Sequence, residues 1–338
     1  MQVNRPFSMI ATAVLCLATL VCQVDVSLAQ SDLADEDRAT LMFDLQMSKM
    51  MEGEFAEAMG DEIADLMPEI EEGDLEPQDI DRVSGMMTLP NSIQDFEKMG
   101  MQPMAGMDYL FKLEFADSDA TEKALAKMKE EGDTIEVGGQ TYFTNPEVEG
   151  MLGRKTNDTT IEVGTEKYLS QTSRDLVSAN LKAAFNKTED VGFRLVMDLE
   201  SESELVAEAM AMATTQSGGE PMAAGMIQLM DNMSDLRLSF DLDADTMLSL
   251  AMTGKNDEDA AELQGGLDGM LGMAKMFGGP ATKDIPDAEL AKAAEGIVMG
   301  LKATRDGNDV SINIARPENL VEAVKSAMDG GMAGPGGF

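Results

Sequence analysis

The sequence predicts an α+β fold, in which antiparallel β-hairpins form the sheet and helices pack on one face, after a helical N-terminal segment. Three observations support this fold class. Segments such as residues 109–115 alternate between apolar and polar residues, which is typical of half-buried strands. Glycine-containing turns join such segments, as at Gly138-Gly139. Longer stretches such as residues 257–277 carry apolar residues at helical spacing. Hairpin turns favour antiparallel pairing, with helices added to one face.

The first part of the chain is expected to be mainly helical. Its helical stripe over residues 32–72 consists of Leu41, Met42, Leu45, Met51, Phe55 and Met59. Pro68, Gly73 and Pro77 end that pattern, and a partly extended region follows to about Pro103.

Strands and helices then alternate. We expect a strand over 109–115, a helix over 117–129, a hairpin over 134–143, an extended pair over 155–170 and a short helix over 175–185.

An internal echo follows, because residues 193–202 (FRLVMDLESE) align without gaps to residues 236–245 (LRLSFDLDAD). Every second residue of each segment is apolar, which predicts two equivalent strands. Four charged residues would then face outward, where opposite charges can pair across a sheet: Arg194, Asp198, Arg237 and Asp241.

Residues 246–254 are expected to return as a hairpin partner, and Asn256 to cap the following helix. The side chains that this helix should bury are Ala260, Leu263, Leu267, Met270, Leu271, Ala274 and Phe277. Gly265 and Gly269 lie four residues apart on the helix, so we expect a closely packed neighbour to offset their cost.

In the C-terminal part, the sequence predicts a helix over 287–295 and two strands within 297–315 that are joined at residues 306–308. A last helix is expected from Pro317 to Met328. The expected organisation is a signal peptide (1–29), a mainly helical segment (30–103), two α+β units (104–190 and 191–329) and a flexible tail (330–338).

The N-terminus has the features of a secretory signal. Arg5 precedes an apolar run from Met9 to Val21, and Ser27-Leu28-Ala29 places small residues at a cleavage site. We expect cleavage after Ala29 and a periplasmic or extracellular location, with an uncleaved anchor as the alternative. Both cysteines lie within this signal, so the mature chain would contain none.

The charge balance is strongly acidic, with 25 Lys and Arg against 63 Asp and Glu and a formal net charge of −38. This field repels nucleic acid and anionic membranes, and it attracts cations or basic partners. Adaptation of the surface to a salty exterior explains the same imbalance. With 43% hydrophobic residues and no later long apolar run, the mature chain should be globular and soluble, without an integral membrane span.

Most catalytic chemistries are excluded. The chain has no histidine and the mature part no cysteine, which removes Ser-His-Asp, Cys-His and thiolate or histidine metal sites. No catalytic residue or cofactor site is expected. A carboxylate-based hydrolase remains the least favoured function, because 4% aromatic residues and no tryptophan suit a sugar cleft poorly.

Asp241, Asp243 and Asp245 alternate in SFDLDADT and are the calcium candidates. An EF-hand is excluded, because Thr246 stands where it needs glycine and Met252 where it needs glutamate. A looser cation site and the solvated face of a strand remain. We favour the strand, with Phe240 and Leu242 pointing into a core and Asp245 helping to turn the chain.

Methionine is abundant, at 31 residues, and thioethers are soft ligands for Cu(I). Met270, Met273 and Met276 are explained better as core filling on a helix. The better Cu(I) candidates lie in a glycine- and proline-flanked loop: Met99, Met101, Met104 and Met107.

The order of DYLFKLEFADSDATEKALAKM, VGGQTYF, NDTTIEVGTEKYLSQ, FRLVMDL and LRLSFDLDADTMLSLAMTG is similar to that of exported proteins of planctomycete-type bacteria. KNDEDAAEL followed by a long helix is the most specific part, and the resemblance covers most of residues 80–330. It implies an exported α+β domain and brings no functional residues.

The sequence therefore predicts an exported, soluble, acidic, non-enzymatic protein with a binding or structural role. The alternative is a carrier of a lipid-like ligand, or a protein that binds Ca²⁺ or Cu(I) weakly.

Overall fold

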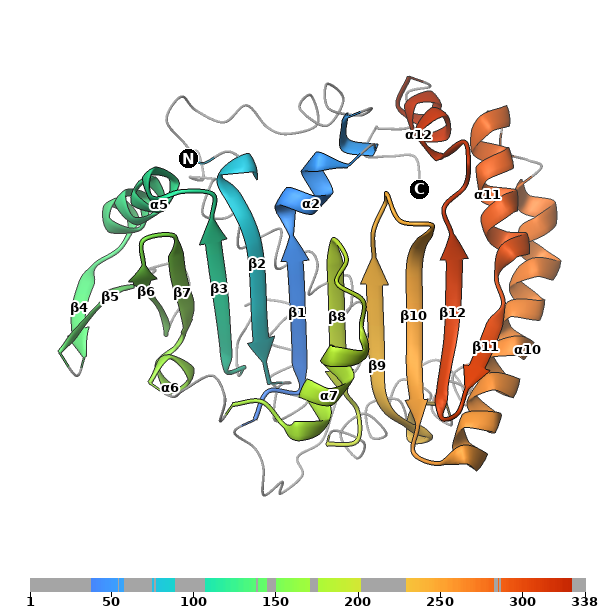
Figure 1. Cartoon of the computed structure of the whole chain (residues 1–338), viewed down its shortest axis with the longest axis horizontal. Coiled ribbons are helices and arrows are strands. Elements are labelled where there is room, and N and C mark those ends of the chain that lie inside the picture. Colours follow the sequence, from blue (N-terminus) through green and yellow to red (C-terminus); the bar gives the residue numbers. More distant parts are fainter. Residues whose placement is uncertain are drawn as a thin grey trace, which may run out of the picture. The chain divides into compact units, whose positions relative to one another are not determined.

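The computed structural model describes residues 38–53, 55–57, 75, 77–88, 107–137, 139–144, 150–170, 176–201, 229–282, 285 and 287–329 (Figure 1). These residues fall into two compact units built from interleaved segments. Unit 1 comprises Met1–Ser48, Pro68–Ala183 and Met197–Asp231, and unit 2 comprises Lys49–Met67, Ala184–Val196 and Asn232–Phe338.

Unit 1 contains an antiparallel sheet with the strand order β1-β2-β3-β7-β6-β5-β4. Its strands are β1 (Leu41–Gln46), β2 (Ile80–Met87), β3 (Tyr109–Phe115), β4 (Thr134–Val137), β5 (Gln140–Thr144), β6 (Met151–Asn157) and β7 (Thr160–Thr165). The 3-10 turn η1 (Pro77–Asp79) leads into β2, and the short helix α6 (Glu166–Leu169) follows β7.

The two faces of this sheet differ in chemistry, because side chains alternate along each strand. Phe43 of β1 and Phe111 of β3 lie on the apolar face with ring centroids 5.7 Å apart. A Cβ on Gly85, between them in β2, would stand within 2.5 Å of both rings, so the site requires glycine.

Helix α5 (Ser118–Glu131) begins at Asp117, whose carboxylate accepts the Ala120 N–H at 2.8 Å. Its buried side chains Leu125 and Met128 contribute to the core, and Met128 lies against Gly153 of β6. The helix therefore covers the part of the apolar face formed by β3, β5 and β6.

Unit 2 contains the antiparallel strand order β9-β10-β12-β11. Its strands are β9 (Met233–Phe240), β10 (Thr246–Gly254), β11 (Ala303–Asp306) and β12 (Asp309–Ala315). Three elements contribute residues to both units: α2 (Met47–Glu52), α7 (Ala179–Lys187) and β8 (Phe193–Asp198).

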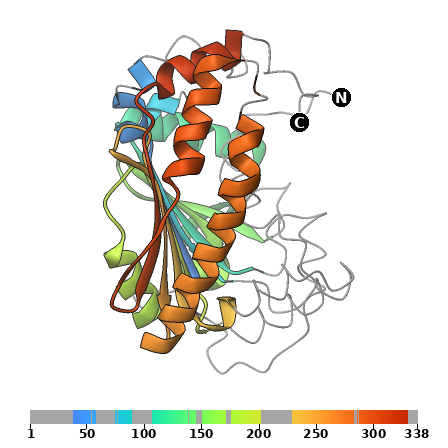
Figure 2. The ribbon, with the colours of Figure 1, turned by 90° about the vertical axis from the view of Figure 1, so that its right-hand side faces the viewer.

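Three helices belong to the C-terminal part of unit 2: α10 (Asp257–Thr282), α11 (Ala288–Gly300) and α12 (Leu320–Asp329). Helix α10 packs against β9, β10, β11 and β12, and α11 packs beside α10 (Figure 2). Leu263, Leu267, Met252 and Val310 are buried and form the core of this unit. Within the described residues, none of the helices is both long and apolar enough to cross a membrane.

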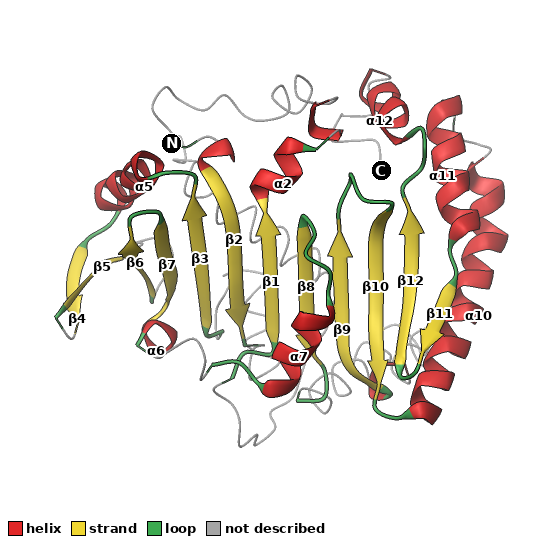
Figure 3. Cartoon of the chain, viewed as in Figure 1, coloured by secondary structure: helices red, strands yellow, loops and turns green. Residues whose placement is uncertain are grey.

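The predicted α+β class is confirmed, as the mixture of strands and helices in Figure 3 shows. The strand over 109–115 and the hairpin of β4 and β5 are confirmed, with Gly139 at φ 81° in its turn. The cap at Asn256 is confirmed as well, because its side-chain oxygen accepts the Glu258 and Asp259 N–H groups at 2.9 and 3.0 Å.

Two secondary-structure predictions were wrong, one in the N-terminal segment and one near the C-terminus. Residues 41–46 form β1, which pairs with β2 along its whole length. The apolar pattern of this segment fits both helical and strand periods, and long-range pairing decides between them. Residues 297–300 were also misassigned, because they belong to α11 and not to a strand.

The predicted outward orientation was wrong for two residues of the internal echo. Asp198 and Arg237 are buried, at 1% and 6% exposure. Their charges are satisfied by neighbours from other segments, which a strand pattern does not reveal.

The expected close packing at Gly265 and Gly269 was also wrong. A Cβ at either position would meet no atom within 4 Å. These glycines face open space, so no packing gain offsets their cost in helix stability.

Candidate binding surface

Asp241, Asp243 and Asp245 lie in the connection between β9 and β10, because β9 ends at Phe240. Asp241 accepts the Gly192 N–H at 3.2 Å and the Asp243 N–H at 3.0 Å. Phe240 and Leu242 are half-buried, so the expected core position of these two residues was wrong.

Asp243 accepts the Phe55 N–H at 2.9 Å, and its carboxylate lies 3.6 Å from Arg316 Nη1. Asp245 is exposed, and its carbonyl accepts the Arg316 N–H. Asp241 and Asp243 thus fasten backbone segments of unit 2 to this connection. Across the described ranges, no three His, Cys, Asp or Glu side chains are arranged to hold a metal ion. Calcium binding here stays a prediction.

Of the four methionines that are Cu(I) candidates, the structure describes one. Met107 is buried just before β3, whereas Met99, Met101 and Met104 lie outside the described residues. Cu(I) binding by this group stays a prediction.

An ion network that the sequence did not reveal crosses β9, β10 and β12; its members Asp235 and Arg237 are buried, whereas Asp309 and Lys187 are partly exposed. Arg237 Nε lies 2.9 Å from Asp235 Oδ1, and Arg237 Nη2 donates to Asp309. Thr253 donates its hydroxyl to Asp309 at 2.6 Å, and Lys187 of α7 donates to the same carboxylate at 3.2 Å. The charges of these four ionic side chains cancel.

The protonation of Asp309 follows from these contacts. Burial alone would raise the pKa of its carboxyl, but the Thr253 hydrogen bond and the charges of Arg237 and Lys187 outweigh that effect and lower it. A general base works best with a pKa near the working pH. The lowered pKa suits an ion pair that joins three strands rather than proton transfer.

Unit 1 also holds two buried carboxylates, one paired with an arginine and one bonded to serine hydroxyls. Asp44 of β1 is fully buried and accepts both hydrogen bonds from Arg82 of β2, at 2.5 and 2.9 Å. Asp198 accepts hydroxyl hydrogen bonds from Ser178 and Ser201, both at 2.9 Å. These contacts tie separate segments of unit 1 together.

The described surface has a different feature on α10 and α11. Four large apolar side chains are exposed there, and we call them the Met–Phe patch: Met273 (43% exposed), Met276 (63%), Phe277 (71%) and Met299 (56%). Met276 and Phe277 follow Met273 by three and four residues, which places the three side chains on one face of α10.

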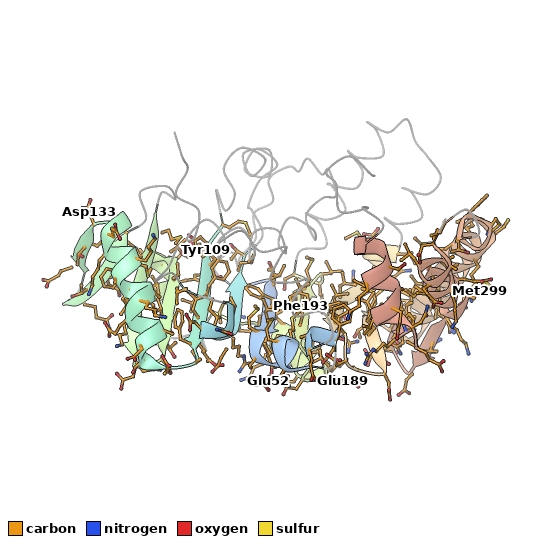
Figure 4. All side chains as sticks on the ribbon, turned by 90° about the horizontal axis from the view of Figure 1, so that it is seen from above. Glu52, Tyr109, Asp133, Glu189, Phe193 and Met299 are labelled. Carbon is orange, nitrogen blue, oxygen red and sulfur yellow. The ribbon has the colours of Figure 1, made fainter. Side chains whose placement is uncertain are left out.

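Contacts between the two helices place the Met299 sulfur near Gly279 of α10. A Cβ at Gly278 would lie 3.2 Å from Val298, and a Cβ at Gly279 would lie 4.0 Å from the Met299 sulfur. The helices thus approach closely where α10 carries glycine, and Gly279 lies three residues after Met276 in the sequence. Figure 4 labels Met299 on α11.

The burial of Phe277 and the core-filling role of Met273 and Met276 were wrong predictions. Helix α10 buries Ala260, Leu263 and Leu267 in its first half, while its second half leaves large apolar side chains in water. Residues 269–283 also contain no Asp or Glu, although the chain has 63 such residues. This half of α10 is therefore an apolar, acid-free surface in a strongly acidic protein.

No family model and no curated protein matches the chain. Among solved structures it is similar to crystal form I of TP0453, with a TM-score of 0.37 and 9% identity over 88% of this chain and 98% of that one. Crystal form III gives 0.35 and 10% over 88% and 99%, and crystal form IV gives 0.38 and 8% over 88% and 98%. A likeness at this level does not identify a shared function.

Proposed function

We propose that this chain is an exported, non-enzymatic binding protein, and that the Met–Phe patch docks a partner protein whose surface is apolar at its centre and basic around it. The observation that carries the proposal is the exposure of Met273, Met276, Phe277 and Met299 together on two packed helices.

Exposed apolar clusters cost solubility and are typical of interaction sites. Methionine is well suited to such a site, because its flexible, polarisable side chain adapts to the shape of a partner. The buried first half of α10 shows that this helix can cover its apolar residues with the strands of unit 2. A partner would cover those of the second half.

The charge of the chain favours a basic partner. A formal net charge of −38 attracts cationic surfaces and speeds their encounter, whereas it repels other acidic molecules. The acid-free stretch 269–283 then supplies apolar contact without burying unpaired carboxylates.

Export is part of the same proposal. It is supported by the signal-like residues 1–29.

The test uses the purified protein and a synthetic amphipathic helical peptide with leucine on one face and lysine on the other. Replacing Met276 and Phe277 together by serine should weaken peptide binding about tenfold or more, because central apolar contacts dominate such interfaces. Met51→Ser is the matched control, since Met51 is 38% exposed but lies on α2.

Fluorescence anisotropy at low and high salt measures both the apolar contribution of the patch and the electrostatic contribution of the charge to peptide binding. Added salt should weaken binding to the wild type and to the control equally. If the double substitution leaves the peptide affinity unchanged and only salt alters it, the binding is purely electrostatic. That result would overturn the docking site.

A carrier of a lipid-like ligand is the second candidate. It is favoured by apolar side chains of β9 and β10 that share one sheet face and are only half-buried: Leu236, Leu238, Phe240, Leu248 and Leu250. A lipid seen bound in native mass spectrometry after mild purification would support it. A ligand-free mass would count against it.

A further inference from the structure

We infer that Met273, Met276 and Met299 form an oxidation site, at which peroxide converts the thioethers to sulfoxides and switches off the Met–Phe patch. This inference rests on the proposed docking function for its consequence, although not for the oxidation itself.

Composition leaves methionine as the main target for a mild oxidant. The chain has no tryptophan and no histidine, and both cysteines lie at positions 16 and 22 within the signal-like segment. An exported protein is also outside the reducing systems of the cytosol.

Among the methionines of the described residues, solvent exposure determines which sulfurs an oxidant can reach. The three patch sulfurs belong to side chains that are 43%, 63% and 56% exposed. Met87, Met128 and Met252 are buried in the sheets and under helices, at 3%, 6% and 4%. Because oxidation requires contact between sulfur and oxidant, the patch should react first.

The reaction is balanced with one peroxide per thioether. A sulfur lone pair attacks one oxygen of H₂O₂, the S–O bond forms and the O–O bond breaks. The sulfur loses two electrons, and the departing hydroxide takes up the second peroxide proton to leave as water. Methionine sulfoxide reductases reverse the change, one enzyme for each sulfoxide epimer.

Oxidation would change the patch because a sulfoxide is polar. It replaces a flexible apolar side chain by a polar, chiral one. Oxidation would make three of the four patch side chains polar and leave only Phe277 apolar. The fold should survive, because these side chains do not fill its core.

The test exposes the folded protein to hydrogen peroxide and follows each methionine by peptide mass spectrometry. Sulfoxide at Met273, Met276 and Met299 should form several-fold faster than at Met87, Met128 and Met252. Oxidation at equal rates would overturn the site.

The second readout is binding, measured with the leucine–lysine peptide and with a hydrophobic fluorescent dye. Patch oxidation should weaken both signals about tenfold while circular dichroism stays unchanged, and treatment with MsrA and MsrB should restore them. Met51 is expected to oxidise as well, without effect on binding.

A variant with Met273, Met276 and Met299 replaced by leucine keeps the patch apolar and cannot be oxidised there. It should bind the peptide before and after peroxide. If patch oxidation leaves binding to the wild type intact, the switch is wrong and the docking function stands. If the untreated protein binds no peptide, the docking function and the switch fail together, while the mass spectra still decide the oxidation site.

Discussion

At the scale of a residue, Asp44 is an example of a buried carboxylate that is paired with a cation. Its carboxylate is fully buried and is held by both guanidinium nitrogens that Arg82 directs at it. A buried carboxylate is costly unless it is paired, so the contact matters less for its own strength than for the penalty it avoids.

Replacing Arg82 by methionine should therefore destabilise the protein by about 3 kcal/mol, because Asp44 would remain buried without its cation. Urea unfolding monitored by circular dichroism measures the change. The double variant Asp44→Leu/Arg82→Met should recover most of the loss. A loss below about 1 kcal/mol for the single variant would mean that water reaches Asp44.

Tyr109 gives a second prediction at this scale. Burial raises the pKa of its phenol from 10.0 to about 12. Between these values the unfolded chain loses this proton while the folded chain keeps it, so stability should fall as pH rises from 10 towards 12.

Absorbance titration of the phenolate checks the assignment, since the chain has only 3 tyrosines. Tyr109→Phe should remove the ionisation step near pH 12 and flatten the decline in stability over that range. A titration curve that the substitution leaves unchanged above pH 11 would contradict the burial of this phenol.

At the scale of an element, helix α10 differs between its two halves. Its first half is held against β9, β10, β11 and β12, while its second half contacts α11 and leaves the Met–Phe patch exposed. Its glycines differ in their surroundings, since Gly278 packs against Val298 of α11 whereas Gly265 and Gly269 face open space.

Alanine at Gly265 or Gly269 should therefore stabilise the protein by about 0.5–1 kcal/mol each, because a Cβ removes backbone entropy from the unfolded chain and meets no atom in the fold. Thermal unfolding measures the gain. Gly278→Ala is the control: its Cβ would press on Val298 at 3.2 Å, so it should gain less or lose stability. Equal gains at all three positions would contradict the packing of α10 on α11.

The same element shows which features a sequence reveals. Strand β3 and the hairpins were predictable, because alternation and turn glycines are local signals. The exposure of Phe277 was not, because its helical spacing matches that of the buried Leu263 and Leu267. Which half of a helix is covered depends on the length of the sheet beneath it.

The ion network was hidden for a related reason. Asp235 and Arg237 stand two residues apart with opposite charges, which signals a shared strand face. Their partner Asp309 lies 72 residues beyond Arg237, and the register of β9, β10 and β12 brings it there. Long-range register cannot be read from one sequence.

At the scale of the whole molecule, a net charge of −38 acts on stability as well as on binding. Repulsion between like charges opposes the compact state, and salt screens it over a Debye length that falls from about 30 Å at 0.01 M to about 3 Å at 1 M. The urea midpoint should therefore rise with sodium chloride. A falling midpoint would show that the surface ion pairs outweigh the repulsion.

A single experiment on the whole protein can show whether the Met–Phe patch docks a basic, apolar-centred partner. Methyl NMR of the protein labelled at its methionine methyl groups tests it most directly, with the leucine–lysine peptide as the titrant. We expect shifts at Met273, Met276 and Met299, which are exposed, and none at the buried Met87 and Met252. Shifts confined to other methionines, or none at saturating peptide, would contradict it.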